Sequence, residues 1–270
     1  MNEKWELLRT RIEELSKKNV CLAFSGGVDS GLLMKLFVDA GAKIQAVMFD
    51  TRLHPRADIE GARQLAAECG VPFTLLAVDE STEPSVYQNL PDRCYHCKKK
   101  MFSELKRWAA GRGMDQIVEG TNAEDLLAYR PGIRALGELS ILSPLAECGL
   151  DKAEIRKMAA AVGLSVAEKP SSPCLATRLP YGTPLEPELL HRLEAGEAWF
   201  RRQGFRQVRL RYHDPILRIE VESDELEQLF ALRKEIVEEL KRLDFLYITA
   251  DLEGFRSGSM DLKQNGKSIE

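Results

Sequence analysis

Short apolar runs alternate with longer amphipathic stretches through the first half of the sequence, and this alternation constrains the fold more than any other feature. We predict strands at residues 19–25, 43–50, 73–79 and 116–121, separated by helices at residues 29–41, 57–70 and 97–113. Apolar strands joined by helices are typical of a parallel sheet with helices on both faces. Ligands of such sheets bind beyond the carboxyl ends of the strands.

The second half of the sequence predicts a smaller unit. Residues 122–150 are loop-rich, and the following helix, at residues 151–163, begins with a capping box in which Asp151 precedes Glu154 by three positions. Pro, Ser and Gly are dense in residues 168–187, which indicates an extended connection. Beyond it we predict a helix at residues 186–204, strands at 207–213 and 216–222, a long helix at 224–243 and a strand at 245–251. The expected fold is therefore α/β, with a parallel-sheet domain at residues 1–170 and a smaller C-terminal α/β domain at residues 171–270.

Charge and hydropathy narrow the class of protein. A net charge of −4 disfavours a protein that depends on contacts with a nucleic-acid backbone. No apolar run is long enough to span a membrane, and residues 1–18 lack the apolar core of a signal peptide. We therefore expect a cytoplasmic protein, whose six cysteines do not form a disulfide framework.

The segment from Ser25 to Ser30, SGGVDS, lies between the first predicted strand and its helix. Two glycines, Gly26 and Gly27, let the backbone approach a ligand without a Cβ clash. The helix N-terminus that follows offers unpaired N–H groups to a phosphate, and Ser25 and Ser30 add hydroxyls. Asp29 is suited to hold Mg²⁺ against the phosphates. The segment predicts a nucleotide site.

Three other interpretations compete with a phosphate loop of this kind. A plain strand-to-helix turn would use Asp29 or Ser30 as the helix N-cap. A GxGxxG dinucleotide fingerprint is absent after the first strand. Gly266-Lys267-Ser268 resembles the end of a Walker A loop but lacks its first glycine, so we interpret it as a polar tail.

The cysteines fall into two groups. Cys21 and Cys69 lie in apolar or helical patterns and are expected to be buried, whereas Cys148 is undecided. Cys94, Cys97 and Cys174 lie in polar, loop-like surroundings. Cys174 is the best nucleophile candidate, because Lys169 and Arg178 lie nearby in sequence and would favour a thiolate; the alternative is an inert buried thiol.

Arginines concentrate between residues 201 and 218, against the single carboxylate Asp214. The six are Arg201, Arg202, Arg206, Arg209, Arg211 and Arg218. Arg209 and Arg211 alternate on a predicted strand, so they share one face and could bind a phosphate. The alternative is a solvated basic edge.

The SGGVDS string is similar to that of PP-loop ATP-pyrophosphatases (adenine nucleotide alpha hydrolase-like proteins), which cleave ATP to AMP and pyrophosphate. Four further segments, in this order, resemble the LarE family of sulfur transferases that serve the nickel-pincer cofactor of lactate racemase. They are RCYHCK (residues 93–98), GTNAEDLLAYRPG (120–132), SSPCLATRLPYG (171–182) and GFRSGSMDL (254–262). The resemblance extends from residue 20 to residue 262.

The resemblance implies a specific reaction. ATP would adenylate a carboxylate of a pyridinium dicarboxylate mononucleotide, and cysteine sulfur would displace AMP to leave a thiocarboxylate. Cys174 matches the sulfur-bearing cysteine of the family, and the small-molecule substrate would contact Arg178, Glu197, Arg209 and Arg211. Further ATP contacts are implied at Met48, Gly120, Thr121 and Arg130. Hexamers are suggested by the resemblance alone, and no nucleic-acid or membrane partner is expected.

The source of the sulfur stays open at this point. Some members of the family sacrifice a lone cysteine, whereas others have three, as here. The three thiolates of Cys94, Cys97 and Cys174 suit a [4Fe–4S] cluster, which we favour. The alternatives are a redox pair, two ordinary helix-start residues, or a zinc site completed by His96 or Cys148.

Three other functions remain as rivals. A tRNA thiolation enzyme of the PP-loop superfamily would need a tRNA surface, which the acidic balance disfavours. An amidating synthetase would use ammonia and would not need Cys174. A nucleotide-binding iron–sulfur sensor would produce no AMP.

Overall fold

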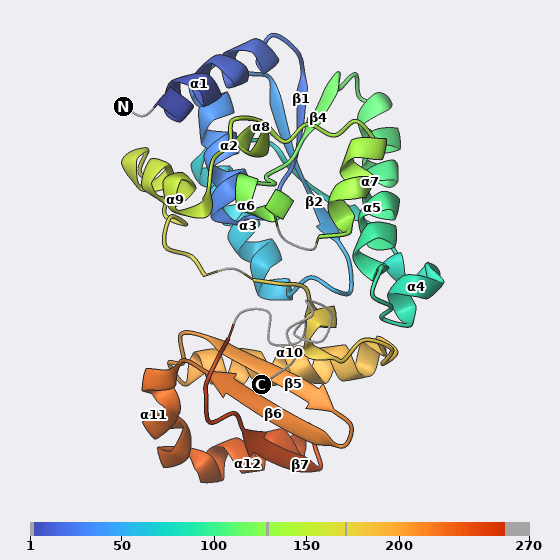
Figure 1. Cartoon of the computed structure of the whole chain (residues 1–270), viewed down its shortest axis with the longest axis vertical. Helices are drawn as coiled ribbons and strands as arrows, with labels where there is room; N and C mark the ends of the chain where they lie inside the picture. The colour runs from blue at the N-terminus through green and yellow to red at the C-terminus, as the bar shows by residue number, and fades with distance from the viewer. Residues whose placement is uncertain (1–2, 128–129, 171, 257–270) are drawn as a thin grey trace. The chain divides into compact units, whose positions relative to one another are not determined.

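The computed structural model describes residues 3–127, 130–170 and 172–256, and it divides the chain into two compact units (Figure 1). Unit 1 comprises Met1–Val86 and Asp92–Ser172, and unit 2 comprises Tyr87–Pro91 and Pro173–Glu270. The sequence prediction placed a single boundary after residue 170. The short excursion of residues 87–91 into unit 2 was not foreseen, because no composition change accompanies it.

Unit 1 contains a four-stranded parallel sheet with the strand order β3–β2–β1–β4. The strands are β1 (Val20–Ala23), β2 (Ile44–Asp50), β3 (Phe73–Ala77) and β4 (Gln116–Val118). In the central strand, Leu22 lies opposite Ala46 of β2 on one side and Val118 of β4 on the other. The strand order reverses direction between β1 and β4, which is where open parallel sheets bind their ligands.

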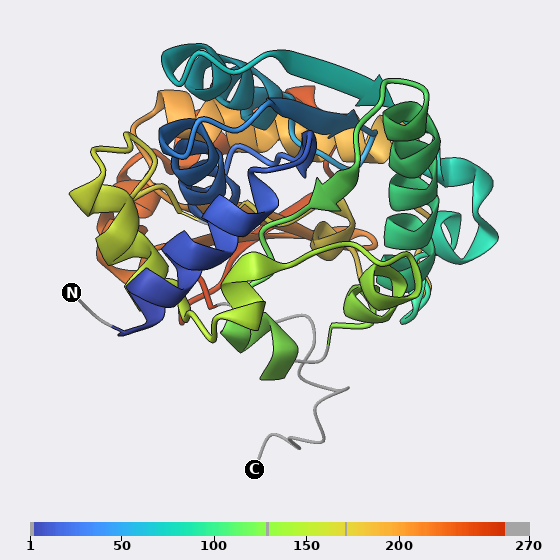
Figure 2. The ribbon, with the colours of Figure 1, turned by 90° about the horizontal axis from the view of Figure 1, so that it is seen from above.

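Helices cover both faces of this sheet, as predicted. The helices in this part of the chain are α1 (Glu3–Leu15), α2 (Val28–Asp39), α3 (Arg56–Glu68), α4 (Pro84–Tyr87, which crosses into unit 2), α5 (Arg93–Ala110), α6 (Ala123–Leu127), α7 (Gly132–Glu138), α8 (Pro144–Glu147) and α9 (Lys152–Ala161), with a 3₁₀ turn η1 (Glu80–Thr82). Figure 2 shows α1 and α5 on opposite sides of the sheet. The cover is two-sided because successive residues of a strand point to opposite faces.

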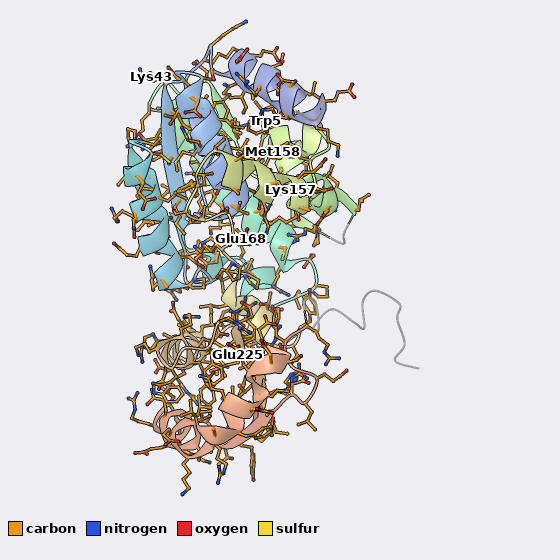
Figure 3. All side chains as sticks on the ribbon, turned by 90° about the vertical axis from the view of Figure 1, so that its left-hand side faces the viewer. Trp5, Lys43, Lys157, Met158, Glu168 and Glu225 are labelled. Atoms are coloured by element: carbon orange, nitrogen blue, oxygen red, sulfur yellow. The ribbon has the colours of Figure 1, made fainter. Side chains whose placement is uncertain are left out.

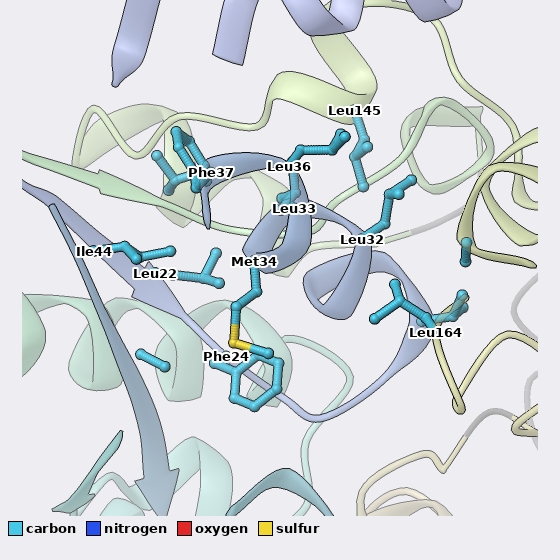
Figure 4. Packing of buried hydrophobic residues seen from close by; sticks show 14 of the residues in the cluster. Leu22, Phe24, Leu32, Leu33, Met34, Leu36, Phe37, Ile44, Leu145 and Leu164 are labelled. Carbon is cyan, nitrogen blue, oxygen red and sulfur yellow. The ribbon is translucent and has the colours of Figure 1, made fainter. Parts of the chain in front are cut away.

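Two hydrophobic clusters fill the two faces. Leu22 and Ile44 pack with Leu33 and Phe37 of α2 in the larger cluster, which also receives side chains from α1, α3 and α9 (Figure 4). Trp5 of α1 packs against the same cluster (Figure 3). On the other face, strand residues including Cys21 and Val47 pack against α5 and α7.

Unit 2 is built from one three-stranded sheet and the helices beside it. Its elements are η2 (Leu175–Arg178), α10 (Pro187–Arg202), β5 (Val208–His213), β6 (Ile216–Val221), η3 (Ser223–Glu225), α11 (Leu226–Ala231), α12 (Arg233–Arg242) and β7 (Tyr247–Ala250). Strands β5 and β6 pair antiparallel, and β6 and β7 pair parallel. A Cβ on Gly196 of α10 would lie 2.5 Å from Leu210 Cδ1 and 3.4 Å from Leu240 Cδ2, so this helix packs tightly on β5 and α12.

Several predicted boundaries were wrong. Helix α5 begins at Arg93 rather than at residue 97, so Cys94 also lies in the helix and not in a loop before it. The predicted long helix at 224–243 is interrupted at Leu232, between α11 and α12. Residues 122–150 contain three short helices, and β3 is only half-buried because it lies at an edge of the sheet. Within the described ranges, no helix combines the length and the apolar character needed to cross a membrane.

Candidate functional site

The loop between β1 and α2 has a backbone that requires glycine. Gly26 has φ +69°, a left-handed conformation that favours glycine. A Cβ at this position would lie 2.7 Å from the Cβ of Ala62 and 2.9 Å from its Cα. The loop therefore packs directly against α3, and this contact holds its shape.

The start of α2 presents backbone N–H groups rather than a side-chain cap. Gly27 is the N-cap and makes no side-chain cap bond, so the alternative in which Asp29 or Ser30 caps the helix is wrong. The first helical bond runs from Gly31 N to Gly27 O (2.9 Å), which leaves the amides of residues 28–30 for a ligand. The hydroxyls of Ser25 and Ser30 lie 3.1 Å apart. Such a helix start is suited to bind phosphate.

Two lysines approach this loop from segments distant in sequence. Lys152 Nζ, at the start of α9, makes an ion pair with Asp29 Oδ2. The other oxygen, Asp29 Oδ1, is buried and has no hydrogen-bond partner among the described residues. Lys169 Nζ lies 3.4 Å from Gly26 O and 3.2 Å from Asp58 Oδ1, so it belongs to the loop in unit 1. The prediction that Lys169 assists Cys174 was based on sequence proximity alone, which does not place a side chain.

The sequence analysis did not identify Lys152 as a site residue, because residues 151–154 were interpreted only as the start of a helix. Lys152 is the first helical residue inside the capping box of Asp151 and Glu154, which the structure confirms. That cap fixes where α9 begins, and the first helical residue then faces Asp29. A lysine directly after a capped helix start was the available signal.

The carboxyl end of β4 closes the other side of the loop. A Cβ on Gly120 would lie 3.1 Å from Ser30 N and 3.2 Å from Asp29 Cβ. The buried carboxylate of Glu119 accepts hydrogen bonds from Thr121 N (2.9 Å) and Thr121 Oγ1 (2.8 Å), which fixes the backbone after the strand. Gly120 and Thr121 therefore lie beside the SGGVDS loop, at the reversal of strand order.

The two remaining predicted ATP contacts have different surroundings. Met48 is 2% exposed within β2 and belongs to the larger hydrophobic cluster. Arg130 is exposed and pairs with Asp125 Oδ1 at 2.9 Å.

Cys94 and Cys97 occupy the first turn of α5 and share one side of it, three residues apart. Both thiols are partly exposed. A Cβ on Gly132, at the start of α7, would lie 3.2 Å from the carbonyl oxygen of Cys94, so the two helices approach closely there. His96 Nε2 lies 3.1 Å from Asp92 Oδ2. Over the residues that the structure describes, no three His, Cys, Asp or Glu side chains are grouped closely enough to hold a metal ion.

Cys174 belongs to unit 2 and immediately precedes η2. Its carbonyl oxygen accepts hydrogen bonds from Thr177 Oγ1 (2.8 Å) and from Arg178 Nη1 (3.3 Å). Arg178 Nη1 also donates to Pro173 O at 3.1 Å. The backbone around Cys174 is therefore held, while its side chain stays partly exposed.

Arg178 is buried and forms a two-pronged ion pair with Glu197 of α10. Arg178 Nε lies 2.8 Å from Glu197 Oε1, and Arg178 Nη2 lies 2.9 Å from Oε2. Burial alone would lower the pKa of Arg178, but the charge of Glu197 outweighs it and raises that pKa. Burial would likewise raise the pKa of Glu197, yet Arg178 holds it below its usual range.

Arg209 and Arg211 share one face of β5, as predicted, but they are not a solvated edge. They are 5% and 4% exposed. Arg211 Nε lies 3.0 Å from Glu220 Oε2 of β6, and Arg211 Nη1 donates to Thr177 O at 2.6 Å. Burial, and then repulsion from Arg178, lower the pKa of Arg209 to about 10. The buried guanidinium groups of Arg178, Arg209 and Arg211 therefore lie close enough to lower one another's pKa by repulsion.

The other arginines of the run differ in their surroundings, and Arg201 lies 3.8 Å from the same Glu197 that pairs with Arg178. Arg206 is exposed and pairs with Asp224, because it lies before the strand begins. Arg218 pairs with Glu220 and Asp251. The pairing of β5 with β6 and of β6 with β7 brings carboxylates from outside residues 201–218 beside these arginines. The sequence of that segment alone does not reveal them.

The remaining cysteines are not part of either site. Burial raises the pKa of Cys21 to about 12, as expected of a core thiol. Cys148 is buried in the larger cluster of unit 1, and burial raises its pKa. Cys69 is only partly buried, because it caps the end of α3. Of the segment 254–262 only residues 254–256 are described, and Gly266-Lys267-Ser268 lies outside the described residues.

Comparison with known proteins gives matches along nearly the whole chain. A protein-family model described as NAD synthase matches residues 1–104. An uncharacterized protein of Synechocystis is 34% identical over 264 residues, which cover 97% of this chain and 98% of that protein. The pyridinium-3,5-bisthiocarboxylic acid mononucleotide synthase of Lactiplantibacillus plantarum is 33% identical over 246 residues, covering 90% of this chain and 89% of that protein. A tRNA-specific 2-thiouridylase of Acidothermus cellulolyticus is 28% identical over 57% of this chain and 53% of its own length.

Proposed function

Because this chain belongs to the LarE family of ATP-dependent sulfur transferases, we propose that it converts the carboxylates of a pyridinium dicarboxylate mononucleotide to thiocarboxylates for the nickel-pincer cofactor. The observation that carries this proposal lies in unit 2. There Arg178 links the backbone of Cys174 to the buried Glu197, and Arg209 and Arg211 are buried in the same unit. A sulfur nucleophile and an anion site thus share one small unit, as sulfur transfer to an anionic substrate requires.

ATP activates the carboxylate in the first step. The amides of residues 28–30 and the hydroxyls of Ser25 and Ser30 bind phosphate, and Gly26, Gly27 and Gly120 let the backbone approach it. When bound, Mg²⁺ would neutralise charge on the phosphates, and Asp29 would hold it through the oxygen that has no partner among the described residues. Lys152, which pairs with the other oxygen of Asp29, would supply a second cation beside the same loop. Met48, Thr121 and Arg130 complete the proposed ATP contacts.

The second step forms the carbon–sulfur bond. The carboxylate oxygen attacks the α-phosphorus of ATP and releases pyrophosphate, which gives an acyl-adenylate. A sulfur nucleophile delivered through Cys174 attacks the acyl carbon, and AMP leaves with the bonding electron pair. Arg209 and Arg211 bind the phosphate of the mononucleotide, and Arg178 with Glu197 holds their surroundings and the Cys174 loop in place.

We propose that Cys94, Cys97 and Cys174 hold a [4Fe–4S] cluster. Two thiols on one helical turn and a third in a held loop are a soft donor set that suits iron and sulfide. Two of them also lie near a crossing of the chain between the units: Cys94 is two residues after Asp92, where unit 1 resumes, and Cys174 is one residue after Pro173, where unit 2 resumes. When bound, the cluster would supply sulfide on its open iron, so that Cys174 is not consumed.

Iron content and intact mass test this proposal together. Anaerobic reconstitution should give about four irons per chain, and Cys→Ala at any of the three positions should lose them. Added sulfide should support repeated thiolation while Cys174 keeps its mass. Loss of one H₂S from Cys174 after a single turnover would refute the cluster mechanism in favour of a sacrificial cysteine. The assignment as a sulfur transferase would still hold. Four bound irons without AMP formation would leave only a nucleotide-binding iron–sulfur sensor.

A tRNA thiolation enzyme is the second candidate, because tRNA-specific 2-thiouridylases match part of the chain. They cover about 57% of it and about half of their own length, and the net charge of −4 gives little attraction to a nucleic-acid backbone. Incubation with ATP and either tRNA or the mononucleotide separates the two. AMP released only with tRNA would favour the thiouridylase.

A further inference from the structure

Residues 87–91 are held within unit 2 although the chain on both sides of them belongs to unit 1. Backbone bonds secure the segment, from Gly182 N to Asn89 O (3.0 Å) and from Leu185 N to Tyr87 O (2.8 Å). Tyr87 also donates its hydroxyl hydrogen to Glu186. The segment therefore lies along residues 179–186 of unit 2.

Asn89 is the centre of this attachment. It is fully buried and has φ +54°, a conformation that asparagine tolerates better than most residues. Its Nδ2 donates to Pro180 O at 2.9 Å and to Leu179 O at 3.3 Å. A buried amide that serves two carbonyls of one loop makes the attachment specific to that loop.

Both ends of this attachment lead to the cysteines of the proposed reaction. Cys94 follows Pro91 by three residues, so their Cα atoms are at most about 11 Å apart whatever path the chain takes. Leu179 directly follows η2, whose Arg178 and Thr177 bind the carbonyl of Cys174. This tether follows from chain connectivity and from contacts inside unit 2, and it holds for any placement of the two units.

We infer that Asn89 is a positioning residue for sulfur transfer, which keeps the start of α5, with Cys94 and Cys97, within reach of the Cys174 loop. The inference rests on the proposed function for its chemical role, while the tether itself can be measured without it. Without the two side-chain bonds, residues 87–91 would leave the loop more readily, and encounters between the two cysteine sites would become less frequent.

Thiol cross-linking of the full chain tests the tether. A short bis-maleimide is added to the apoprotein, and the linkage of Cys174 to Cys94 or Cys97 is followed by peptide mass spectrometry. In Asn89→Asp the donor is replaced by a carboxylate that faces the same carbonyls, and in Asn89→Gly the positive φ is kept but the amide is lost. Both should cross-link about tenfold more slowly, which corresponds to about 1.4 kcal/mol.

Asn19→Asp is the matched control, because Asn19 Nδ2 also donates to a backbone carbonyl, Gly113 O at 2.9 Å, but within unit 1. It should cross-link at the rate of the unchanged protein, and ATP affinity should be unchanged in all three variants when each is assayed well below its own melting temperature. Three results would each overturn the inference: cross-linking of both Asn89 variants at the rate of the unchanged protein, no cross-link in the unchanged protein, or a loss of ATP affinity that parallels the slower cross-linking. A slower cross-link in a protein that never thiolates the mononucleotide would instead confirm the tether and refute the proposed function.

Discussion

Replacement of Arg178 by Met is expected to be among the most damaging single changes in unit 2. Arg178 is 1% exposed, and its partner Glu197 is 2% exposed. The change removes both bonds to Glu197 and those to the carbonyls of Pro173 and Cys174. A buried carboxylate that loses its counter-charge costs about 3–5 kcal/mol of unfolding free energy, which is the expected loss at pH 7.

The double variant Arg178→Met, Glu197→Gln separates stability from function. The Gln carbonyl can still accept from Leu210 N, which donates to Glu197 Oε1 at 3.1 Å in the unchanged protein, and the buried carboxylate that lost Arg178 is no longer charged. We therefore expect the double variant to recover about half or more of the lost stability. It should not recover thiolation, because the guanidinium that donates to the carbonyls of both Pro173 and Cys174 is lost.

The sign of the pH dependence gives a second check. In the unchanged protein the pKa of Glu197 is depressed, so its stabilising contribution is present above the unfolded pKa of about 4.3 and is lost as pH falls through the folded pKa. In Arg178→Met, burial without the counter-charge would raise that pKa, and the penalty should shrink as pH falls from about 7 toward 5. Denaturant unfolding at the two pH values measures this. A loss below about 1 kcal/mol, or one equal at both pH values, would refute the assignment of a buried, ionised pair.

Three further predictions concern the phosphate loop and the arginine cluster. Asp29→Ala should abolish AMP formation in a folded protein if Asp29 holds Mg²⁺, and pyrophosphate release at the unchanged rate would contradict this role. Gly26→Ala should lose ATP binding and about 1–3 kcal/mol of stability, because the new Cβ would lie 2.7 Å from the Cβ of Ala62 in a backbone with φ +69°. Calorimetry of ATP binding and of thermal unfolding measures the two effects, and normal ATP affinity would contradict the prediction. Arg209→Ala should weaken mononucleotide binding by about 2 kcal/mol and leave ATP affinity unchanged, and equal affinity for the mononucleotide in titration calorimetry would remove Arg209 from the substrate site.

Local patterns in the sequence were sufficient for much of the fold. Apolar strand runs predicted the parallel sheet covered on both faces, since burial on both sides removes the polar alternation of an exposed sheet. The capping box of Asp151 and Glu154 and the loop at Gly26 and Gly27 were also readable, because each depends on residues within a few positions of one another. Boundaries such as the start of α5 at Arg93 were not, because packing against α7 decides where that helix can begin.

Other features depended on contacts between distant segments, and only the tertiary structure decided them. Lys152 reaches Asp29 across more than a hundred residues, Glu197 buries the charge of Arg178, and Asn89 attaches to the loop after Cys174. The residues next to a charged or polar side chain in the sequence do not identify the group with which it will pair. Its partner is the group that folding places beside it once water is removed, and burial then decides whether that pair is weak or essential.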